Sequence, residues 1–298
     1  MSDDEGKKRL IVVSGMSGAG KSVALHTLED LGYYCIDNLP AGLLETVVDE
    51  IVLHGDPSID LLAVGIDARN RPADLAALPA LIRNFRARDI ATDVLFIQAG
   101  KDVLLKRYSE TRRRHPMAAD GTELRAAIAS EREMLADVAS SADLTIDTSK
   151  LSIYELADTI RERVDRRRGN TLSVLIQSFG FKHGIPADAD FVFDLRALPN
   201  PYWTVKLRGL TGLDPEVIRF LDAAENIDDM HDDIVAFLEK WIPRWKAAGR
   251  GYMTVAIGCT GGQHRSVYMT ERVAKSLATV HDAIAIRHSA LARAAMGR

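Results

Sequence analysis

Residues Leu10–Ser22 read LIVVSGMSGAGKS, and this short stretch settles how the first half of the chain folds. Its second part, Gly15–Ser22, has the pattern G-x-x-x-x-G-K-S/T. An apolar run, Leu10–Val13, leads into the pattern, and an amphipathic segment, Val23–Leu31, follows it. A strand, a glycine-rich loop and a helix in this order are the context in which the pattern binds phosphate. The alternative, a glycine-rich turn that merely joins strand to helix, is disfavoured by that context.

The loop supplies the groups that the phosphates of a nucleotide need. Glycines let successive backbone N–H groups converge on phosphate oxygens, and the N-terminus of the following helix adds its dipole. We predict that Lys21 reaches the β- and γ-phosphates and that the Ser22 hydroxyl binds Mg²⁺, which makes both catalytic residues. The predicted ATP-binding residues are Gly15, Met16, Ser17, Gly18, Ala19, Gly20, Lys21 and Ser22.

A carboxylate that serves Mg²⁺ is expected at the end of a neighbouring strand. Asp37, in YYCIDNLP, and Asp67, in LLAVGIDARN, both stand in such a position. Asp67 follows the longer apolar run and is the third predicted catalytic residue, but capping of the following helix is the alternative for either aspartate. In the same segment, Arg69 is available to contact phosphate and Asn70 to bind a base or ribose.

Apolar and helical segments alternate through the first half of the chain. Near-continuous apolar strands joined by helical crossovers are typical of a parallel sheet covered on both faces, so we predict an α/β fold. The predicted strands are Leu10–Ser14, Tyr33–Asp37, Leu61–Asp67, Asp93–Ala99 and Leu144–Asp147, and the predicted helices are Ser22–Leu31, Leu43–Leu53, Asp74–Arg88, Leu124–Val138 and Glu155–Val164.

The second half is predicted to be a smaller α/β domain. The charged run Arg161–Asn170, RERVDRRRGN, marks the boundary and gives domains 1–168 and 169–298. Gly and Pro punctuate the stretch from Gly180 to Gly212, which indicates long functional loops. The predicted strands are Leu172–Phe179, Phe191–Leu195 and Thr254–Gly258, and the predicted helices are Ile227–Trp245 and Ser266–Leu277.

A basic cluster, made of Arg107, Arg112, Arg113 and Arg114, precedes a His-Pro pair. In small-molecule kinases, arginines of a lid close over the transferring phosphates, because the guanidinium fork matches phosphate geometry. The alternative is a solvated basic end of a helix. No acceptor-substrate site is readable in the sequence, so phosphate transfer to a metabolite has no support of its own.

Composition and charge restrict the function classes. The 298 residues are 47% hydrophobic and 27% charged, and 38 Lys and Arg against 42 Asp and Glu give a net charge of −4. The whole chain therefore exerts no general attraction on nucleic acid or anionic membranes. Two cysteines, Cys35 and Cys259, are too few for a disulfide scaffold. With no signal peptide and no long apolar run, we expect a soluble cytoplasmic protein.

A second glycine-rich loop, Gly258–Ser266, reads GCTGGQHRS and lies between a predicted strand and a predicted helix. Its glycines, its arginine and a serine at a helix N-terminus suit a phosphate. The spacing C-x-x-x-x-x-R-S also resembles the anion loop of cysteine phosphatases, where a thiolate attacks phosphate. Against that chemistry, Gly258 stands where those enzymes usually have a histidine. We expect a phosphate ligand to be bound without cleavage; a purely structural turn is the other alternative.

With both loops in view, the chain resembles the RapZ/YvcJ family of P-loop nucleotide-binding proteins over nearly its full length. The resemblance rests on residues 15–40 (GMSGAGKSVALHTLEDLGYYCIDNLP), 67–70 (DARN), 107–116 (RYSETRRRHP), 177–203 (QSFGFKHGIPADADFVFDLRALPNPYW) and 255–271 (VAIGCTGGQHRSVYMTE). It implies an N-terminal kinase-like domain that binds ATP through the first loop and hydrolyses nucleotide weakly. It also implies GTP contacts at Asp67, Ala68, Arg69 and Asn70.

The resemblance further implies an oligomer-forming C-terminal domain, distantly similar to half of a phosphofructokinase. In one branch of the family this domain senses glucosamine 6-phosphate and binds small RNAs, one of which it presents to a ribonuclease. The residues implied for the sugar phosphate are Thr260, Gly261, Gly262, His264, Arg265 and Ser266. Tyr202 stands where the sensing branch has a histidine. The last lysine is Lys275, so the C-terminal tail offers RNA few positive charges.

Three function classes follow. The first is a regulatory protein that binds and slowly hydrolyses ATP and GTP with Mg²⁺ and senses a phosphorylated metabolite, with an aminosugar phosphate as the suspected ligand. The second is an RNA-binding adapter that guides a small RNA to a ribonuclease. The third is a metabolite kinase. The first class is our prediction, as a homo-oligomer; salt-dependent RNA retention and label transfer from the γ-phosphate distinguish the other two.

Overall fold

The computed structural model describes most of the chain as two compact units, Met1–Gly169 and Asn170–Arg298. The residues described are 8–53, 59–111, 114–118, 123–165, 172–248, 250–281 and 283–291.

The first unit is built on five parallel strands in the order β2-β3-β1-β4-β5. The central strand β1 pairs with β3 on one side and with β4 on the other, so that Val12 lies beside both Val64 and Val94. The strand bounds are β1 Arg9–Gly15, β2 Tyr34–Ile36, β3 Leu61–Gly65, β4 Ala91–Gln98 and β5 Leu144–Asp147.

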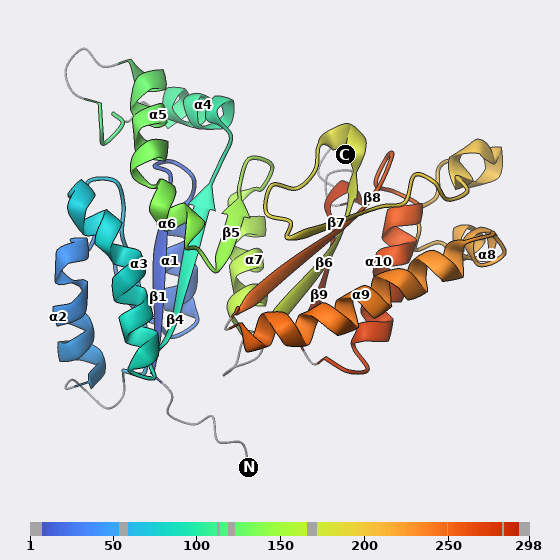
Figure 1. Ribbon diagram of the computed structural model, residues 1–298. Coiled ribbons are helices and arrows are strands. Elements are labelled where there is room, and N and C mark those ends of the chain that lie inside the picture. Colours follow the sequence, from blue (N-terminus) through green and yellow to red (C-terminus); the bar gives the residue numbers. More distant parts are fainter. Residues whose placement is uncertain are drawn as a thin grey trace. The chain divides into compact units, whose positions relative to one another are not determined.

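Helices cover both faces of this sheet (Figure 1). Helices α1 and α7 pack against each other on one face, and α3 and α6 pack against each other on the other. Because both faces are covered, residues 10–13 of β1 are fully excluded from solvent. The helix bounds are α1 Lys21–Asp30, α2 Leu44–Val48, α3 Pro72–Ala87, α4 Lys101–Thr111, α5 Leu124–Met134, α6 Ala136–Ser140 and α7 Ile153–Asp165.

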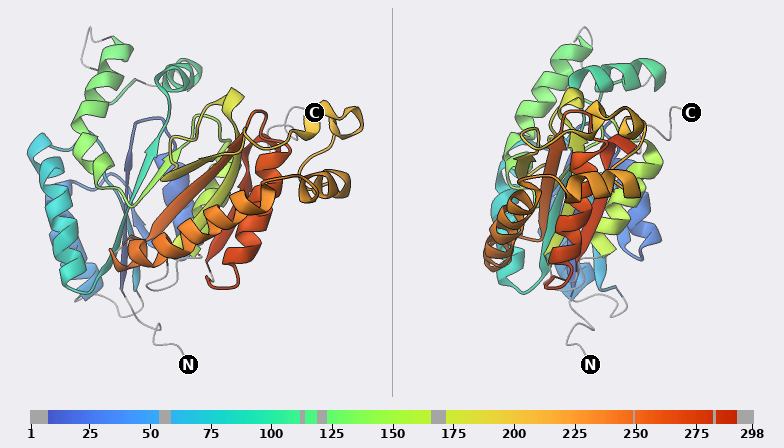
Figure 2. Two further views of the ribbon diagram at one scale, coloured as in Figure 1. Left: turned by 45° about the vertical axis from the view of Figure 1, so that its right-hand side comes forward. Right: turned by 90° about the vertical axis from the view of Figure 1, so that its right-hand side faces the viewer.

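The second unit is a four-stranded parallel sheet in the order β7-β8-β6-β9. Figure 2 shows the long helix α9, in orange, running along this sheet. The strand bounds are β6 Ser173–Gly180, β7 Phe191–Asp194, β8 Tyr252–Cys259 and β9 Ile284–His288, and the helix bounds are α8 Pro215–Asp222, α9 Ile227–Ala247 and α10 Arg265–Leu277.

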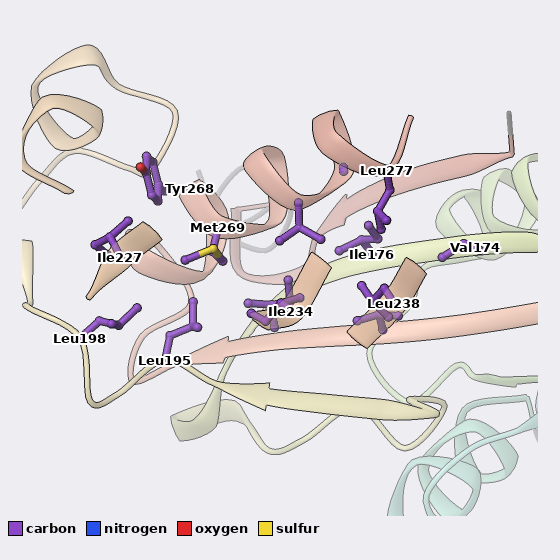
Figure 3. Close-up of a cluster of buried hydrophobic side chains, with 14 of the residues drawn as sticks. Val174, Ile176, Leu195, Leu198, Ile227, Ile234, Leu238, Tyr268, Met269 and Leu277 are labelled. Atoms are coloured by element: carbon purple, nitrogen blue, oxygen red, sulfur yellow. The ribbon is translucent and has the colours of Figure 1, made fainter. Parts of the chain in front are cut away.

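The core of the second unit is an apolar cluster shared by the strands and the three helices (Figure 3). The cluster includes Ile176 of β6 together with Ile234 and Leu238 of α9. Met269 and Leu277 continue it along α10. Burial of such side chains, at about 25 cal/mol per Å² of apolar surface, is the main force that holds the helices on the sheet. The same packing fixes the N-terminal end of α10, where the second glycine-rich loop ends.

The predicted α/β fold with parallel strands is confirmed, and three local predictions are wrong. The helix predicted over Leu124–Val138 is two helices, α5 and α6, which part at the buried Leu135. The helix predicted over Leu43–Leu53 is α2 continued by a π-helical turn, Asp49–Leu53. Strand β3 ends at Gly65, two residues before the predicted Asp67.

Three elements were not predicted: α4, α8 and β9. Helix α4 is strongly polar, and its buried side chains are Leu104 and Tyr108, which is too few to give a readable apolar stripe. Strand β9 is short, and its pattern of burial is irregular. Within the described residues, none of the helices is both long enough and apolar enough to cross a membrane.

Candidate functional sites

The loop Gly15–Ser22 joins the central strand β1 to α1 in a backbone conformation that glycine favours. Gly15, Gly18 and Gly20 have φ angles of 138°, 81° and 118°, which residues with a Cβ rarely adopt. At Gly15 the space is also closed, because a Cβ there would lie 2.0 Å from the Ile97 carbonyl oxygen. The sequence pattern therefore corresponds to a loop that curls over the end of the sheet.

Lys21 begins α1 and turns back over the loop. Its Nζ donates a hydrogen bond to the Gly15 carbonyl oxygen at 2.6 Å. Burial lowers the pKa of Lys21 below its usual range, and the nearby carboxylates of Glu131 and Asp67 oppose this effect only in part. The ammonium group of Lys21 is therefore held close to the loop backbone, and the nearby carboxylates do not fully offset the effect of its burial.

Two side chains from later elements brace the loop from outside. Thr148, just after β5, donates from Oγ1 to the Ala19 carbonyl oxygen at 2.7 Å. Arg107, on α4, donates from Nη1 to the Gly18 carbonyl oxygen at 3.1 Å and to Thr148 Oγ1 at 3.0 Å. The first arginine of the basic cluster thus supports the loop backbone.

Of the other three arginines in the basic cluster, the structure describes Arg114. Arg114 donates from Nε to the Ala118 carbonyl oxygen at 3.0 Å. Arg112 and Arg113 lie outside the described residues, so the lid that we predict from these arginines stays a prediction.

Glu131, on α5, contacts the loop directly, and it was not identified from the sequence. Its carboxylate accepts hydrogen bonds from the backbone N–H of Ser17, at 3.0 Å to each oxygen, and from the Ser17 hydroxyl at 2.5 Å. His115 completes the arrangement, with Nε2 3.1 Å from Glu131 Oε2. Glu131 and His115 are both buried.

The segment Asp67–Asn70 is held by its own side chains. Asp67 accepts hydrogen bonds from the Arg69 backbone N–H and from the Arg69 guanidinium, the shortest at 2.6 Å from Nη2 to Oδ2. Burial would raise the pKa of Asp67, but the hydrogen bonds from Arg69 and the charge of Lys21 lower it. The Asn70 amide donates to the Asp67 carbonyl and accepts from the backbone N–H of Ala41.

Asp37 differs from Asp67 in its exposure. It lies just after β2 and is exposed, and its Oδ1 approaches the end of β3, 2.7 Å from where a Cβ on Gly65 would stand. Its charge also reaches Lys21. Both candidate carboxylates therefore lie near the loop, but Asp67 is already paired with Arg69.

The second loop, Gly258–Ser266, joins β8 to α10. Gly262 has a φ angle of 75°, and a Cβ on Gly180 at the end of β6 would lie 2.6 Å from the Gly261 carbonyl carbon. The loop therefore sits against the backbone of the neighbouring strand, at the carboxyl ends of the parallel strands where ligands bind in open α/β sheets.

The thiol of Cys259 is buried in this loop and strongly hydrogen-bonded. Its Sγ lies 3.2 Å from the Ser266 hydroxyl and accepts the Gly262 backbone N–H, also at 3.2 Å. Burial would raise the pKa of Cys259, but these hydrogen bonds and the charge of Arg265 lower it below the usual range. The hydrogen bonds and the nearby Arg265 thus more than offset the effect of burial on this thiol.

Arg265 is buried and divided between two tasks. Its Nη1 donates to the backbone carbonyls of Leu195 and Leu198, at 3.4 and 2.8 Å, and also to that of Arg196, while Nη2 donates to Thr260 Oγ1 at 3.3 Å. Its Nε is buried and has no hydrogen-bond partner among the described residues. One edge of the guanidinium therefore anchors the loop that follows β7, while Nη2 contacts Thr260 and the group as a whole also interacts with the Cys259 sulfur.

A packing contact distinguishes this loop from that of a cysteine phosphatase. A Cβ at Gly258 would lie 2.5 Å from Phe179 and 2.7 Å from Phe181. The centroids of these two rings are 4.8 Å apart. The position before Cys259 is therefore closed to larger side chains.

With the geometry of both loops in hand, comparison with known proteins decides the family. Residues 8–168 match the model of the RapZ-like N-terminal domain, and residues 172–292 match that of the RapZ C-terminal domain. The chain belongs to the RapZ family. This confirms the resemblance on which the sequence-based predictions drew.

Close relatives of this RapZ-family chain match it almost from end to end. A nucleotide-binding protein of Alkalilimnicola ehrlichii is 51% identical, over 96% of this chain and 99% of its own length. A nucleotide-binding protein of Hahella chejuensis is 48% identical, over 96% of this chain and all of its own length. Among solved structures, shikimate kinase from Bacteroides thetaiotaomicron aligns with 52% of this chain and 98% of its own, at 15% identity and a TM-score of 0.35.

The RapZ-family residues predicted for the sugar phosphate are only partly brought together. Cys259 is hydrogen-bonded to Ser266 and to the Gly262 backbone N–H, and the charge of Arg265 acts on it. Arg265 in turn donates to Thr260. His264 is buried and its Nε2 donates to the Leu207 carbonyl oxygen at 3.1 Å, so this nitrogen is engaged within the protein.

Tyr202 and Lys182 differ from what the sequence led us to expect for the second site. Tyr202 was predicted for the site, but it is half-exposed, and its ring contacts are with Trp203 and the Arg208 guanidinium. Lys182 was not predicted, yet its Nζ is 3.9 Å from where a Cβ on Gly261 would stand. Lys182 belongs to the quoted motif FGFKHG, and a lysine beside a phosphate loop is the signal that could have identified it.

Both units of the RapZ-family chain place the same Asp-x-Arg turn next to their glycine-rich loop. Asp194, the last residue of β7, and Arg196 repeat the contacts of Asp67 and Arg69, with 2.6 Å between Nη2 and Oδ2 in each pair. Strand β7 lies beside β8 as β3 lies beside β1. Arg196 also stacks on Phe181, with its guanidinium carbon 4.0 Å from the ring centroid.

Proposed function

We propose that this protein binds ATP or GTP through Gly15–Ser22, hydrolyses it slowly, and binds a phosphorylated metabolite at Cys259–Ser266. The observation that carries the nucleotide part is the loop itself, whose glycine conformations, following helix and Lys21 form a phosphate-binding arrangement. The names of the relatives, nucleotide-binding proteins, support the same ligand class. We propose slow hydrolysis and a regulatory role because the chain belongs to this family.

The test is equilibrium binding on the full chain. Thermal unfolding and calorimetry with ATP, GTP and ADP, each with Mg²⁺, should show stabilisation by at least one nucleotide, since a ligand that binds only the folded state raises the unfolding temperature. No stabilisation and no binding heat at millimolar nucleotide would reject the nucleotide part. Specific contacts of GTP with Asp67–Asn70 would require Arg69 or Asn70 to exchange an internal partner for the ligand.

Mg²⁺ fits this site as a companion of the nucleotide. Among the described residues, no group of three or more His, Cys, Asp and Glu is placed to hold a metal ion alone, and nucleotide-bound Mg²⁺ needs only one or two protein ligands besides phosphate and water. Ser22, at the start of α1, would supply a hydroxyl, and Asp37 or Asp67 a carboxylate. The ion would neutralise charge on the β- and γ-phosphates.

Asp37→Asn is expected to weaken the Mg²⁺ dependence of nucleotide binding more than Asp67→Asn. The sequence favours Asp67, but its oxygens are occupied by Arg69, whereas Asp37 is exposed. We expect the Mg²⁺ concentration at half-saturation to rise about tenfold in Asp37→Asn, because one charged ligand is lost. In Asp67→Asn the same concentration should rise less than about threefold. A Mg²⁺ titration at fixed nucleotide measures both, and the opposite order would return the metal role to Asp67.

Nucleotide affinity is expected to fall as the pH rises through the pKa of Lys21 in the free protein. Burial sets this pKa below the usual value of 10.5, and bound phosphates would raise it again because they favour the charged form. The full contribution of Lys21 is then present below the free-protein pKa, and binding takes up a proton between the two pKa values. Calorimetry between about pH 7.5 and 10, in buffers of different ionisation enthalpy, checks this; affinity that stays constant or rises with pH contradicts it.

The second site supports binding of a phosphate monoester. The groups that we propose for it are the Arg265 guanidinium, the backbone N–H groups of the loop and the Lys182 ammonium, which lies near Gly261. Cys259 accepts the Gly262 backbone N–H and shares a hydrogen bond with the Ser266 hydroxyl, so its sulfur is engaged within the protein. A hexosamine phosphate is the ligand that we propose from the family, and isothermal titration of the full chain with glucosamine and glucose phosphates tests it.

A further inference from the structure

Glu131 brings a buried carboxylate onto the backbone of the phosphate loop. Its side chain is fully excluded from solvent, and both oxygens lie 3.0 Å from the backbone nitrogen of Ser17. The proposed function assigns the N–H groups of this loop to phosphate oxygens, and the inference below rests on that assignment. In this structure one of these N–H groups is already taken by an anion that belongs to the protein.

His115 holds the carboxylate in this place. The His115 Nδ1 accepts the Met117 backbone N–H at 3.2 Å, which assigns the ring proton to Nε2. Nε2 can then donate to Glu131 Oε2, 3.1 Å away. Together with the Ser17 N–H and hydroxyl, every contact of the carboxylate comes from a donor, as an ionised, acceptor-only carboxylate requires.

The position of Lys21 indicates which phosphate Glu131 would meet. In loops of this pattern the lysine reaches the β- and γ-phosphates. Here its Nζ lies on the Gly15 carbonyl oxygen, two residues before Ser17. Glu131 also exerts the largest of the attractive charge effects on Lys21, ahead of Asp67. The Ser17 end of the loop is therefore the end for the terminal phosphate.

We propose that Glu131 is a specificity-determining residue of the nucleotide site, because its carboxylate occupies the Ser17 N–H that the terminal phosphate of a triphosphate would use. Two negative groups competing for one buried donor repel each other strongly. A γ-phosphate must displace Glu131 before it can bind there. A diphosphate is one phosphoryl group shorter and leaves the contact intact. The site thus favours diphosphates over triphosphates compared with the same loop without Glu131.

The test compares Glu131→Gln with the wild type and with Glu133→Gln, a matched control on the exposed side of the same helix. Dissociation constants are measured with Mg²⁺ for ADP and for a non-hydrolysable triphosphate analogue. Glutamine keeps the size and an acceptor oxygen but removes the charge. We expect Glu131→Gln to shift the preference toward the triphosphate by about tenfold, with ADP affinity changed less than about threefold and Glu133→Gln unchanged.

The outcomes separate this inference from the function on which it rests. If Lys21→Ala removes wild-type binding but Glu131→Gln leaves the ratio of the two constants unchanged, the inference fails and the nucleotide site stands. If neither the wild type nor Glu131→Gln binds any nucleotide, the proposed function fails and the inference fails with it. Equal improvement for both nucleotides would also overturn the selectivity that we assign to Glu131.

A measurement on the wild type covers the case in which Glu131→Gln does not fold. The analogue must move Glu131 away from Ser17, whereas ADP need not. Amide hydrogen exchange in peptides from α5 should therefore be faster with the triphosphate analogue than with ADP. Equal protection of α5 at saturation with either nucleotide would overturn the proposal.

Discussion

Lys21→Ala is expected to abolish measurable nucleotide binding while the second unit stays folded. Lys21 is the first residue of α1, and its ammonium group lies 2.6 Å from the Gly15 carbonyl oxygen of the loop. Charge-assisted contacts to phosphate in a buried site are among the strongest polar interactions. We expect an affinity loss of about 100-fold or more, or about 2.8 kcal/mol. Calorimetry on the full chain measures it.

A matched control makes the result of Lys21→Ala specific. Lys106 is an exposed lysine of the same unit, on α4, and pairs with the exposed Glu110 at 3.8 Å. Lys106→Ala should leave nucleotide affinity within about twofold of the wild type, since exposed charge pairs contribute little. Wild-type affinity in Lys21→Ala would remove the nucleotide site from this loop, whatever the second unit does.

Arg265→Ala is expected both to remove binding of the phosphorylated ligand and to destabilise the second unit. Loss of the guanidinium removes a contact worth about 1.5–3 kcal/mol, more than tenfold in affinity. The backbone carbonyl of Leu198 also loses its Arg265 donor, whereas that of Leu195 keeps the Leu198 N–H, and a buried unsatisfied group costs about 1–3 kcal/mol. Titration with a hexosamine phosphate and urea unfolding measure the two effects separately.

Cys259→Ser provides the contrast for Arg265→Ala. Serine keeps a hydrogen-bonding group between Ser266 and the Gly262 N–H, so affinity for the ligand should change less than about threefold. A phosphatase would behave in the opposite way, because its thiolate is the nucleophile. Release of phosphate that depends on Cys259 would contradict binding without cleavage. Ligand affinity unchanged in Arg265→Ala would contradict the site itself.

Features encoded by contiguous residues could be predicted from the sequence. Each glycine-rich loop is one uninterrupted segment, with its strand before it and its helix after it, so a short pattern predicted both correctly as loops of a parallel α/β fold. The same holds for the long strands and for α9, whose apolar residues recur with regular spacing.

Contacts between distant segments could not be predicted. Glu131 is 114 residues from Ser17 and is one of two glutamates on an ordinary amphipathic helix. Nothing in the spacing of Asp67 showed that Arg69 would occupy its carboxylate. Arg265 was predicted as a ligand for phosphate, and its role in anchoring the loop after β7 depends on carbonyl groups about 70 residues away. Such pairings are set by the tertiary fold, which a local pattern does not contain.

The packing at Gly258 has a consequence for how this loop could change in evolution. A residue larger than glycine at this position collides with the rings of Phe179 and Phe181. The histidine that precedes the nucleophile in cysteine phosphatases would therefore need smaller residues at both of those positions beforehand. Replacing the buried Phe179 beforehand would leave a cavity at the end of β6 and cost about 3–5 kcal/mol. A route by single substitutions from this loop to that of a cysteine phosphatase therefore passes through a destabilised intermediate, and the aromatic pair holds glycine at the position before Cys259.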